Sequence, residues 1–104
     1  MRYEWDTEKD RKNRLKHGIS FELAALVFED DLCFVYPDWM DETGEQRFHA
    51  LGAVLENEAG PSVLLVVHTY REYRHGEEII RIISARPAEK HEFRRYQNQS
   101  LDDC

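Results

Sequence analysis

The pattern of apolar and polar residues predicts four β-strands along the later part of the chain. The clearest is Glu78 to Arg86, in which four isoleucines flank Arg81. β-branched side chains favour extended backbone, and a short apolar run with polar flanks is typical of a strand with little water on either side. The other predicted strands are Leu32 to Tyr36, Gln46 to Leu55 and Ser62 to Arg71. Turn residues in segments 56–61 and 73–77 predict hairpins between the last three strands.

A helix is predicted before the strands, from Asp6 or Thr7 to about Lys16. Asp6 and Thr7 are both suitable N-cap residues, and acidic residues follow in the first turn. The sequence His17-Gly18 ends this helix, because glycine readily adopts the left-handed conformation of a C-cap.

A second helix is expected from Ser20, as its N-cap, to about Phe28, with an apolar face on the sheet. Pro87 suits the first helical position of a last helix, Ala88 to Gln99. Tyr3 to Trp5 alternates as a short additional strand. These elements predict an α+β fold with two N-terminal helices, a four-stranded antiparallel meander and a C-terminal helix. The helices are expected on one face of the sheet, and the other face is expected to be bare.

The length and composition predict one domain, residues 1–104, with a core over about 3–96 and a frayed tail over 97–104. No run approaches the ~18 apolar residues of a membrane helix, and no apolar segment follows the N-terminal charges as in a secretory signal. Cys33 and Cys104 do not make a disulfide framework. A cytoplasmic protein without a membrane partner is therefore expected.

The net charge of −7 is distributed unevenly along the chain. Residues 22–45 include eight acidic residues and no Lys or Arg, whereas residues 1–21 and 68–96 each have a balance of +2. A bound phosphate responds to the local field rather than to the net charge. The overall acidity therefore does not exclude a nucleic acid as ligand.

Arginines occur inside or at the ends of the apolar strands, at Arg71, Arg81 and Arg86. Stripping the hydration from a guanidinium costs on the order of several kcal/mol. Either a carboxylate lies beside each arginine, or the sheet faces a ligand that brings negative charge. In a regular strand Arg81 and Arg86 face opposite sides, so they share a face only if a bulge lies between them, with Ser84-Ala85 as its expected place.

Five sequence blocks in this order resemble the BrnT family of small bacterial ribonuclease toxins from type II toxin–antitoxin systems. The blocks are E-W-D near the start, K-H-G-I-S-F-E-L-A, G-E-Q-R-F, T-Y-R and R-I-I-S-A-R-P-A. The resemblance covers about residues 3–96, and five ordered blocks are far more specific than any one of them. The chain departs from the family pattern in the acidic segment 38–45, at His68, at 73–75 and in the tail 97–104.

This resemblance implies a RelE-like fold and metal-independent cleavage of RNA, which would inhibit translation and growth. It also implies neutralisation by a BrnA-type antitoxin in a hetero-oligomer. Such an antitoxin carries a ribbon-helix-helix DNA-binding domain, so operator DNA is an indirect partner, bound through the antitoxin when the complex represses its own operon. No cofactor is implied. The alternative from another functional class is a non-catalytic binding protein that acts as antitoxin partner and transcriptional co-repressor.

Metal-independent RNA cleavage needs a base for the 2′-hydroxyl, positive charge at the phosphate and an acid for the leaving oxygen. Arginine suits the second task because its planar fork meets two phosphate oxygens and stays charged. We predict a phosphate clamp of Arg71 and Arg86, with Arg81 as third member. The structural alternative is that these arginines pair with carboxylates of Glu45, Glu77 or Glu78.

For proton transfer, the family's K-H-G and G-E-x-R blocks indicate His17 and Glu45 as candidate catalytic residues. His17 is equally well explained as a histidine at a helix C-terminus, and Glu45 as the partner of an arginine across the sheet. His49 and His68 are interpreted as half-buried sheet residues, although histidine titrates near neutrality and could serve as a base.

The predicted RNA-binding residues are Lys16, Arg47 and Tyr96, although Tyr96 could equally be a helix residue packed on the sheet. Three further aromatic side chains could stack on bases, namely Trp5, Trp39 and Phe48, of which Trp5 and Phe48 are also suited to a core. No metal site is predicted, because the five histidines lack the close spacings of zinc motifs and no cysteine pair accompanies them.

Overall fold

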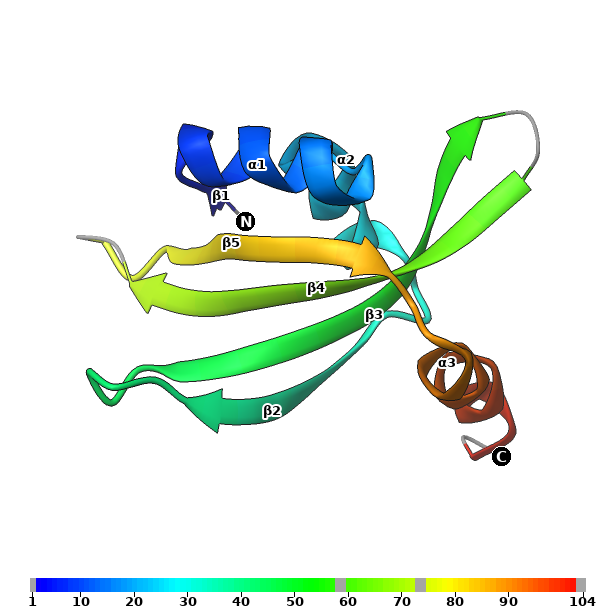
Figure 1. The fold of residues 1–104 in the computed structure, drawn as a ribbon. Helices are drawn as coiled ribbons and strands as arrows, with labels where there is room; N and C mark the ends of the chain where they lie inside the picture. Colours follow the sequence, from blue (N-terminus) through cyan, green and yellow to red (C-terminus); the bar gives the residue numbers. More distant parts are fainter. Residues whose placement is uncertain (1, 58–59, 73–74, 103–104) are drawn as a thin grey trace.

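The computed structural model describes residues 2–57, 60–72 and 75–102 (Figure 1). Five strands form one sheet in the order β1-β5-β4-β3-β2. The elements in chain order are β1 (Arg2–Glu4), α1 (Thr7–His17), α2 (Phe21–Ala25), the 3₁₀ helix η1 (Leu26–Glu29), β2 (Phe34–Met40), β3 (Gln46–Asn57), β4 (Gly60–Glu72), β5 (Glu78–Pro87) and α3 (Lys90–Asp102).

The α+β class is confirmed, but the sheet is mixed rather than a pure antiparallel meander. Strands β2 to β5 pair antiparallel in succession, as predicted. Strand β1 instead pairs parallel with β5, with Tyr3 opposite Ile80. The three residues of β1 do not indicate whether their partner strand runs parallel or antiparallel. Only the long-range contact between the start of the chain and β5 decides this direction.

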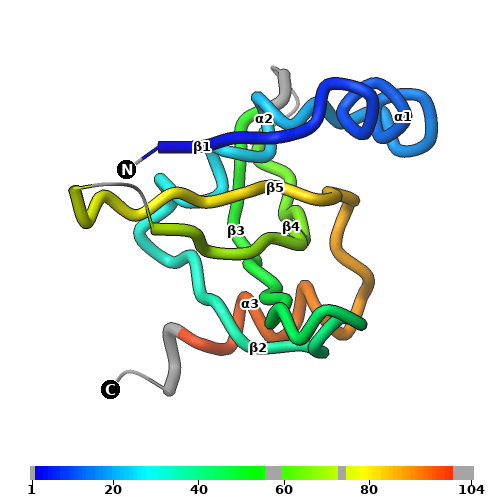
Figure 2. Tube along the Cα trace, turned by 90° about the vertical axis from the view of Figure 1, so that its left-hand side faces the viewer, coloured from blue at the N-terminus to red at the C-terminus, as the bar shows by residue number. Residues whose placement is uncertain are grey.

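The expected arrangement of helices on one face was wrong. α1, α2 and η1 cover one face, and α3 lies against the other face, as Figures 1 and 2 show. Asp6, Gly18 and Ser20 cap α1 and α2 as predicted. The second helix is shorter than expected, because the α-helical turns end at Ala25 and the chain continues as η1. Val27 of η1 is completely buried against β3.

Two prolines lie within strands, although the sequence predicted an element boundary at each. Pro37 was expected to end a strand, and Pro87 was expected to begin the last helix. β2 continues through Pro37 to Met40, which an edge strand allows because its outer N–H groups need no partner. Pro87 is the last residue of β5 rather than the start of a helix. The N–H of Ala88 still donates to Val63 O at 2.9 Å, so the sheet pairing continues and α3 begins only at Lys90.

The last helix also extends beyond its predicted end. α3 continues to Asp102, and the Gln99 side chain donates to the Leu32 carbonyl. Residues 100–102, expected in a frayed tail, are therefore helical, whereas Cys104 lies outside the described residues, as do Tyr73 and Arg74 of the predicted hairpin.

A β-bulge in β5 determines which way its arginines face. Val67 of β4 lies opposite Ser84, but the next residue, His68, lies opposite Ile82, so Ile83 is an extra residue. Beyond this bulge the alternation of β5 is reversed. The bulge that was the condition for a shared face therefore exists, one residue earlier than Ser84-Ala85, and it places Arg81 and Arg86 on the same face.

The hydrophobic core lies between the sheet and the N-terminal helices. Its fully buried members include Phe21 of α2, Val27 of η1, Leu64 and Val66 of β4 and Ile80 of β5. The side chains of these strand residues point away from the arginines, since alternate residues of a strand face opposite sides.

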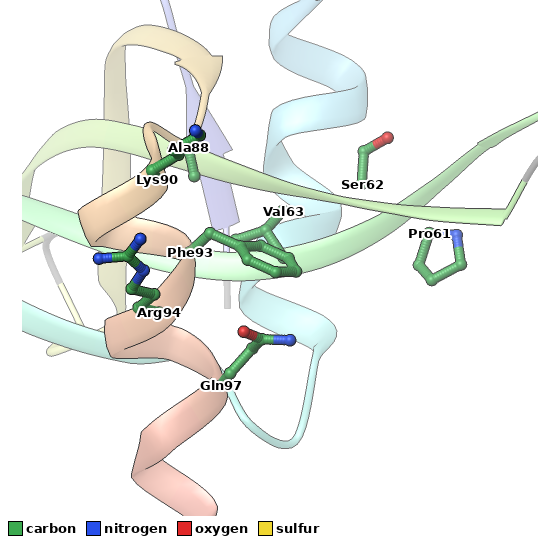
Figure 3. Close-up of a pocket in the computed structure, with 8 residues that line it drawn as sticks. All are labelled: Pro61, Ser62, Val63, Ala88, Lys90, Phe93, Arg94 and Gln97. Atoms are coloured by element: carbon green, nitrogen blue, oxygen red, sulfur yellow. The ribbon is translucent and has the colours of Figure 1, made fainter.

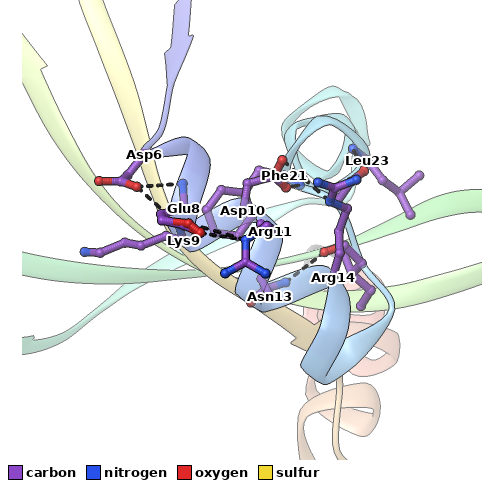
Figure 4. Close-up of polar contacts among 11 residues, drawn as sticks. Asp6, Glu8, Lys9, Asp10, Arg11, Asn13, Arg14, Phe21 and Leu23 are labelled. Carbon is purple, nitrogen blue, oxygen red and sulfur yellow. Dashed lines mark hydrogen bonds and ion pairs between the residues drawn. The ribbon is translucent and has the colours of Figure 1, made fainter.

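Helix α1 is attached to the sheet mainly by polar contacts, because it has almost no apolar face. Buried Asn13 donates to Ala85 O at 2.8 Å and to Ile19 O at 2.9 Å, and it accepts from Ala85 N. Asp10 accepts from Phe21 N at 2.8 Å, which ties α1 to the first turn of α2 (Figure 4). These bonds hold α1 beside the bulged part of β5. Among the described residues, no helix is long and apolar enough to cross a membrane.

Candidate functional site

The face of the sheet opposite the core carries four arginines, and we call it the arginine face. Its register is set by the pairs Tyr36–His49, Leu51–Phe34, Thr69–Arg81 and Leu65–Arg86, because residues opposite each other in antiparallel strands point to the same side. The residues of this face on β3, β4 and β5 include Arg47, His49, Leu51, Leu65, Val67, Thr69, Arg71, Arg81, Ser84 and Arg86.

Arg86 forms the most regular ion pair of this face. Its Nη1 and Nη2 donate to the two carboxylate oxygens of Glu92 at 2.8 and 2.9 Å. Glu92, in the first turn of α3, is 5% exposed and also accepts from Glu89 N at 2.8 Å. Burial raises the pKa of Glu92, but the hydrogen bonds from Arg86 and Glu89 lower it by more than burial raises it. The net shift of the pKa is therefore downward. The carboxylate therefore stays charged and fixes Arg86.

Arg71 and Arg81 meet at the other end of the face, around Glu4 of β1. Arg81 Nη1 lies 3.2 Å from Glu4 Oε1, and Arg71 Nε lies 3.6 Å from the same oxygen. Arg71 is about half exposed, with 51% of its side-chain surface accessible. The structure thus brings Arg71 and Arg81 together.

Arg86 is not part of that pair. Arg86 lies opposite Leu65, which is six residues from Arg71 along β4, or about 20 Å at ~3.3 Å per residue. The two arginines also turn toward different carboxylates. One phosphate cannot bridge Arg71 and Arg86 in this arrangement, so the face offers two separate arginine sites.

Arg47 lies at the start of β3, on the same face. Its Nη2 donates to Asp41 Oδ2 at 3.1 Å, and its guanidinium lies 5.8 Å from the ring centroid of Trp39. The pKa of Asp41 is lowered chiefly by the hydrogen bond from the Thr43 hydroxyl. Across residues 2–57, 60–72 and 75–102, the buried Arg47 Nε and Thr69 Oγ1 have no hydrogen-bond partner.

Glu45, predicted as a base, lies at the end of the turn between β2 and β3. Its backbone N–H donates to Asp41 Oδ1 at 3.0 Å. The expected pairing with an arginine across the sheet is absent from the described contacts, since Arg47 pairs with Asp41 instead.

The two strand histidines have different environments. His68 faces the core side, is completely buried and lies among the rings of Phe28, Phe48 and Tyr70. Burial lowers the pKa of His68 to about 4, so it is a neutral core residue. His49 lies on the arginine face, with Nε2 2.9 Å from Asp38 Oδ2 and Nδ1 3.3 Å from the Tyr36 hydroxyl.

Lys16 and His17 lie at the end of α1, away from the strand arginines. They line an open groove of about 370 Å³ between α1 and the bulged part of β5. The other lining residues are Lys9, Lys12, Asn13, Ile83 and Ser84. β1 pairs with residues 79–81 of β5, and within the part of the chain that the structure describes no strand covers the edge beyond Arg81. Ser84 belongs both to this groove and to the arginine face, so the lysines border the same sheet edge.

Tyr96 holds α3 to the segment after η1. Its hydroxyl donates to Asp30 Oδ2 at 2.5 Å, and Asp30 also accepts from Ala53 N at 2.8 Å. Burial, followed by the hydrogen bond to Asp30, raises the pKa of Tyr96 well above its ordinary value. Of the aromatic residues predicted to stack on bases, Trp39 is 55% exposed. Trp5 and Phe48 pack against other rings.

Two other features offer no comparable chemistry. Glu89, His91 and Glu92 could together contact a cation, but the Glu92 carboxylate is already engaged by Arg86. An open groove of about 550 Å³ lies between α3 and the start of β4, where Phe93 is next to Val63 (Figure 3). Its charged lining residues are cations, Lys90 and Arg94, so it has no base to accept a proton.

The acidic partners of the arginines, Glu4, Asp41 and Glu92, were not predicted from the sequence. Glu92 had a local signal, since a carboxylate three residues after a helix N-cap often reaches back to the cap N–H. Glu4 and Asp41 had none, because their pairing depends on the sheet register. Asp38 was missed because the strand was expected to end at Pro37, and Tyr36 because its contact with His49 depends on the pairing of β2 with β3.

The comparison with protein families finds a matching family model. The model of the family described as "Ribonuclease toxin, BrnT, of type II toxin-antitoxin system" matches residues 5–92. A search among curated proteins found no relative of significant similarity. The family match spans most of the 104 residues, including every strand arginine described above. The chain therefore belongs to the BrnT family of ribonuclease toxins of type II toxin–antitoxin systems.

Proposed function

We propose that this chain cleaves RNA on the arginine face, without a metal ion. The observation that carries the proposal is the bulge at Ile83, because it turns Arg86 to the same side as Arg81 and Arg71. These arginines lie on the face of the sheet that α3 covers in part. Several arginines on one face suit a ligand with several phosphates. The family match supports RNA as the ligand.

Each arginine site would contact a different phosphate of the strand. Arg86 uses Nη1 and Nη2 for Glu92 and Pro87 O, which leaves Nε–H and one Nη2–H among the five donors of a guanidinium. These donors would contact the phosphate that undergoes cleavage. Arg71 and Arg81 would hold a phosphate further along the strand, with Glu4 balancing their charge while RNA is absent.

The basic side chains of α1 extend this surface. Lys16 and His17 border the open edge of β5, where the groove meets the arginine face at Ser84. A strand crossing that edge would bring its backbone from the lysines to Arg81 or Arg86. Lys16 is proposed as a phosphate contact and His17 as a nearby RNA-binding or proton-transfer group, together with Glu45 and Arg47 at the far side. Tyr96, whose hydroxyl is bound to Asp30, would contribute through its position in α3.

The test is cleavage of protein-free RNA by the purified chain in EDTA, compared with Arg71→Ala, Arg81→Ala and Arg86→Ala. Loss of one transition-state donor typically lowers the rate ~10²–10³-fold, which is the expected effect of Arg86→Ala. Arg11→Ala is the matched control, because Arg11 pairs with Glu8 on the exposed side of α1. Full wild-type activity in EDTA together with these losses would support the proposal. Unchanged cleavage by all three variants would contradict the arginine assignments.

We further infer a RelE-like fold for the chain and neutralisation by a BrnA-type ribbon-helix-helix antitoxin in the cytoplasm. The antitoxin would bring the complex to operator DNA, so this chain would contact DNA only indirectly. Co-expression with such an antitoxin should relieve the growth arrest caused by the chain alone. Growth arrest without cleavage of protein-free RNA would point to a ribosome-dependent enzyme. A folded chain with neither effect would favour a non-catalytic partner and co-repressor.

A further inference from the structure

A tyrosine, a histidine and an aspartate lie in a row of close polar contacts on the arginine face. Tyr36 of β2 is directly opposite His49 of β3, and its hydroxyl lies 3.3 Å from His49 Nδ1. Asp38 follows two residues later in β2, with Oδ2 2.9 Å from His49 Nε2. The arrangement exists because β2 continues beyond Pro37, which keeps Tyr36 and Asp38 on the same side of the strand.

The two contacts of His49 define its tautomer. An ionised carboxylate only accepts hydrogen bonds, so Asp38 requires a proton on His49 Nε2. In neutral His49 the other nitrogen, Nδ1, then carries the lone pair and accepts from the Tyr36 hydroxyl. The order hydroxyl, imidazole, carboxylate is that of an activated hydroxyl whose base is oriented by a third group.

Positive charge lies beside this chain of groups. The Arg95 guanidinium of α3 is 4.2 Å from the centroid of the Tyr36 ring. Burial raises the pKa of Tyr36, and so do Glu92 and Asp38, while Arg95 and Arg86 oppose this shift. The phenol therefore keeps its proton at neutral pH. The charged and titratable groups around His49 and Tyr36 are thus Asp38, Arg86, Glu92 and Arg95, with His68 behind them on the core side.

We propose that Tyr36 and His49 are the proton relay that activates the 2′-hydroxyl of the bound RNA, with Asp38 as the positioning residue. This inference rests on the proposed ribonuclease function. The Arg86 site, with Arg95 beside it, would place the reacting phosphate next to Tyr36. The relay of Tyr36 and His49 supplies the base that His17 or Glu45 would otherwise have to provide.

In the proposed step the 2′-hydroxyl gives its proton to the Tyr36 oxygen while the Tyr36 proton moves to His49 Nδ1. The 2′-oxygen forms a bond to phosphorus, the bond from phosphorus to the 5′-oxygen breaks, and a 2′,3′-cyclic phosphate results. The departing 5′-oxygen takes a proton from water, and the hydroxide so formed removes the extra proton from His49. Asp38 compensates the transient positive charge on the imidazole.

The experiment measures single-turnover cleavage of one RNA between pH 5.5 and 9 by the wild type, His49→Ala, Tyr36→Phe and Asp38→Asn. Loss of a general base lowers rates ~10²–10⁴-fold, which is expected for His49→Ala. Tyr36→Phe should be impaired to a similar degree, and Asp38→Asn less. A rate that depends on a neutral imidazole rises with pH and then levels off, and this rise should vanish in His49→Ala. His75→Ala, an exposed histidine of the β4–β5 turn, is the control.

Chemical rescue distinguishes a purely structural role of His49 from its proposed role as a base. Added imidazole should restore part of the activity of His49→Ala, with a pH dependence that follows the free imidazole, because only a missing base can be replaced in this way. Equal rates and pH profiles for the wild type and His49→Ala would overturn the relay alone. A loss of activity in His49→Ala without imidazole rescue, beside a fully active Tyr36→Phe, would also overturn it. A folded wild type that neither cleaves RNA nor arrests growth would overturn the ribonuclease proposal itself.

Discussion

Arg86 and Glu92 are joined by two parallel hydrogen bonds of 2.8 and 2.9 Å, between the end of β5 and the first turn of α3. The Glu92 side chain is almost completely buried, and the Arg86 side chain is about one-third exposed, at 32%. The same arginine therefore stabilises the attachment of α3 and presents its remaining donors on the arginine face. Mutations at this pair should therefore affect stability through the ion pair with Glu92, and RNA cleavage through the remaining donors of Arg86.

Arg86→Ala is expected to destabilise the fold by on the order of 2 kcal/mol, because it leaves the Glu92 charge buried without its partner. The double variant Arg86→Leu, Glu92→Leu should recover most of this stability, since it removes both charges, but it should remain inactive on RNA. Urea denaturation and RNA cleavage of the same samples measure the two effects. Recovery of cleavage in the double variant would show that Arg86 acts only through the fold.

Glu4→Gln is expected to strengthen RNA binding at low salt, because it frees Arg71 and Arg81 from their shared carboxylate. The pair is substantially exposed, so the change in the free energy of unfolding should stay within about 1 kcal/mol. Fluorescence anisotropy with a 2′-deoxy oligonucleotide, which resists 2′-hydroxyl attack, measures binding alone. Glu8→Gln, which frees only Arg11 of α1, is the control. Equal affinities for both variants would place Arg71 and Arg81 outside the binding surface.

His68 predicts a loss of stability in mild acid. Its pKa is about 4 in the folded protein, because of burial, against about 6.5 in the unfolded chain. The unfolded state therefore binds more protons between these values, and stability falls as the pH drops from about 6.5 toward 4. The slope is at most about 1.4 kcal/mol per pH unit. Denaturant midpoints measured at several pH values test this expectation.

His68→Phe is the matched variant for that experiment, since the ring already lies among Phe28, Phe48 and Tyr70. It should flatten the pH dependence above pH 4.5. Carboxylates whose pKa values are lowered, such as Asp30 and Glu92, lose their contribution only at more acidic pH. An unchanged slope in His68→Phe would assign the acid sensitivity to other groups.

Gly52→Ala should destabilise the protein by about 1–3 kcal/mol or more, as overpacking of a core does. A Cβ at position 52 would lie 2.7 Å from both the Cγ1 and the carbonyl oxygen of Val27. The combination with Val27→Ala should therefore not restore stability, because the backbone oxygen remains in place. Thermal unfolding of the single and double variants distinguishes this backbone approach from a side-chain clash. Full recovery in the double variant would contradict it.

Local signals in the sequence were sufficient for much of the fold. The caps at Asp6, Gly18 and Ser20 were predicted because each involves residues within a few positions of one another. The four main strands were predicted from their apolar runs and alternation, whereas a bulge between Arg81 and Arg86 was only the condition under which both would share a face. The extension of β2 through Pro37 was not predictable, because proline is tolerated only at an edge strand and the strand order was unknown.

The sequence by itself determined the α+β class, the helix caps, the apolar strands and the family to which the chain belongs. These features depend on short-range backbone preferences and on the order of motifs. Only the tertiary structure decided the parallel pairing of β1, the face on which α3 lies and the partners of each charged side chain. Arg86 pairs with Glu92, and His49 lies between Tyr36 and Asp38, because sheet register and helix docking place these groups together. A one-residue shift in register turns every side chain of a strand to the other face, and the sequence pattern alone does not fix that choice across several strands.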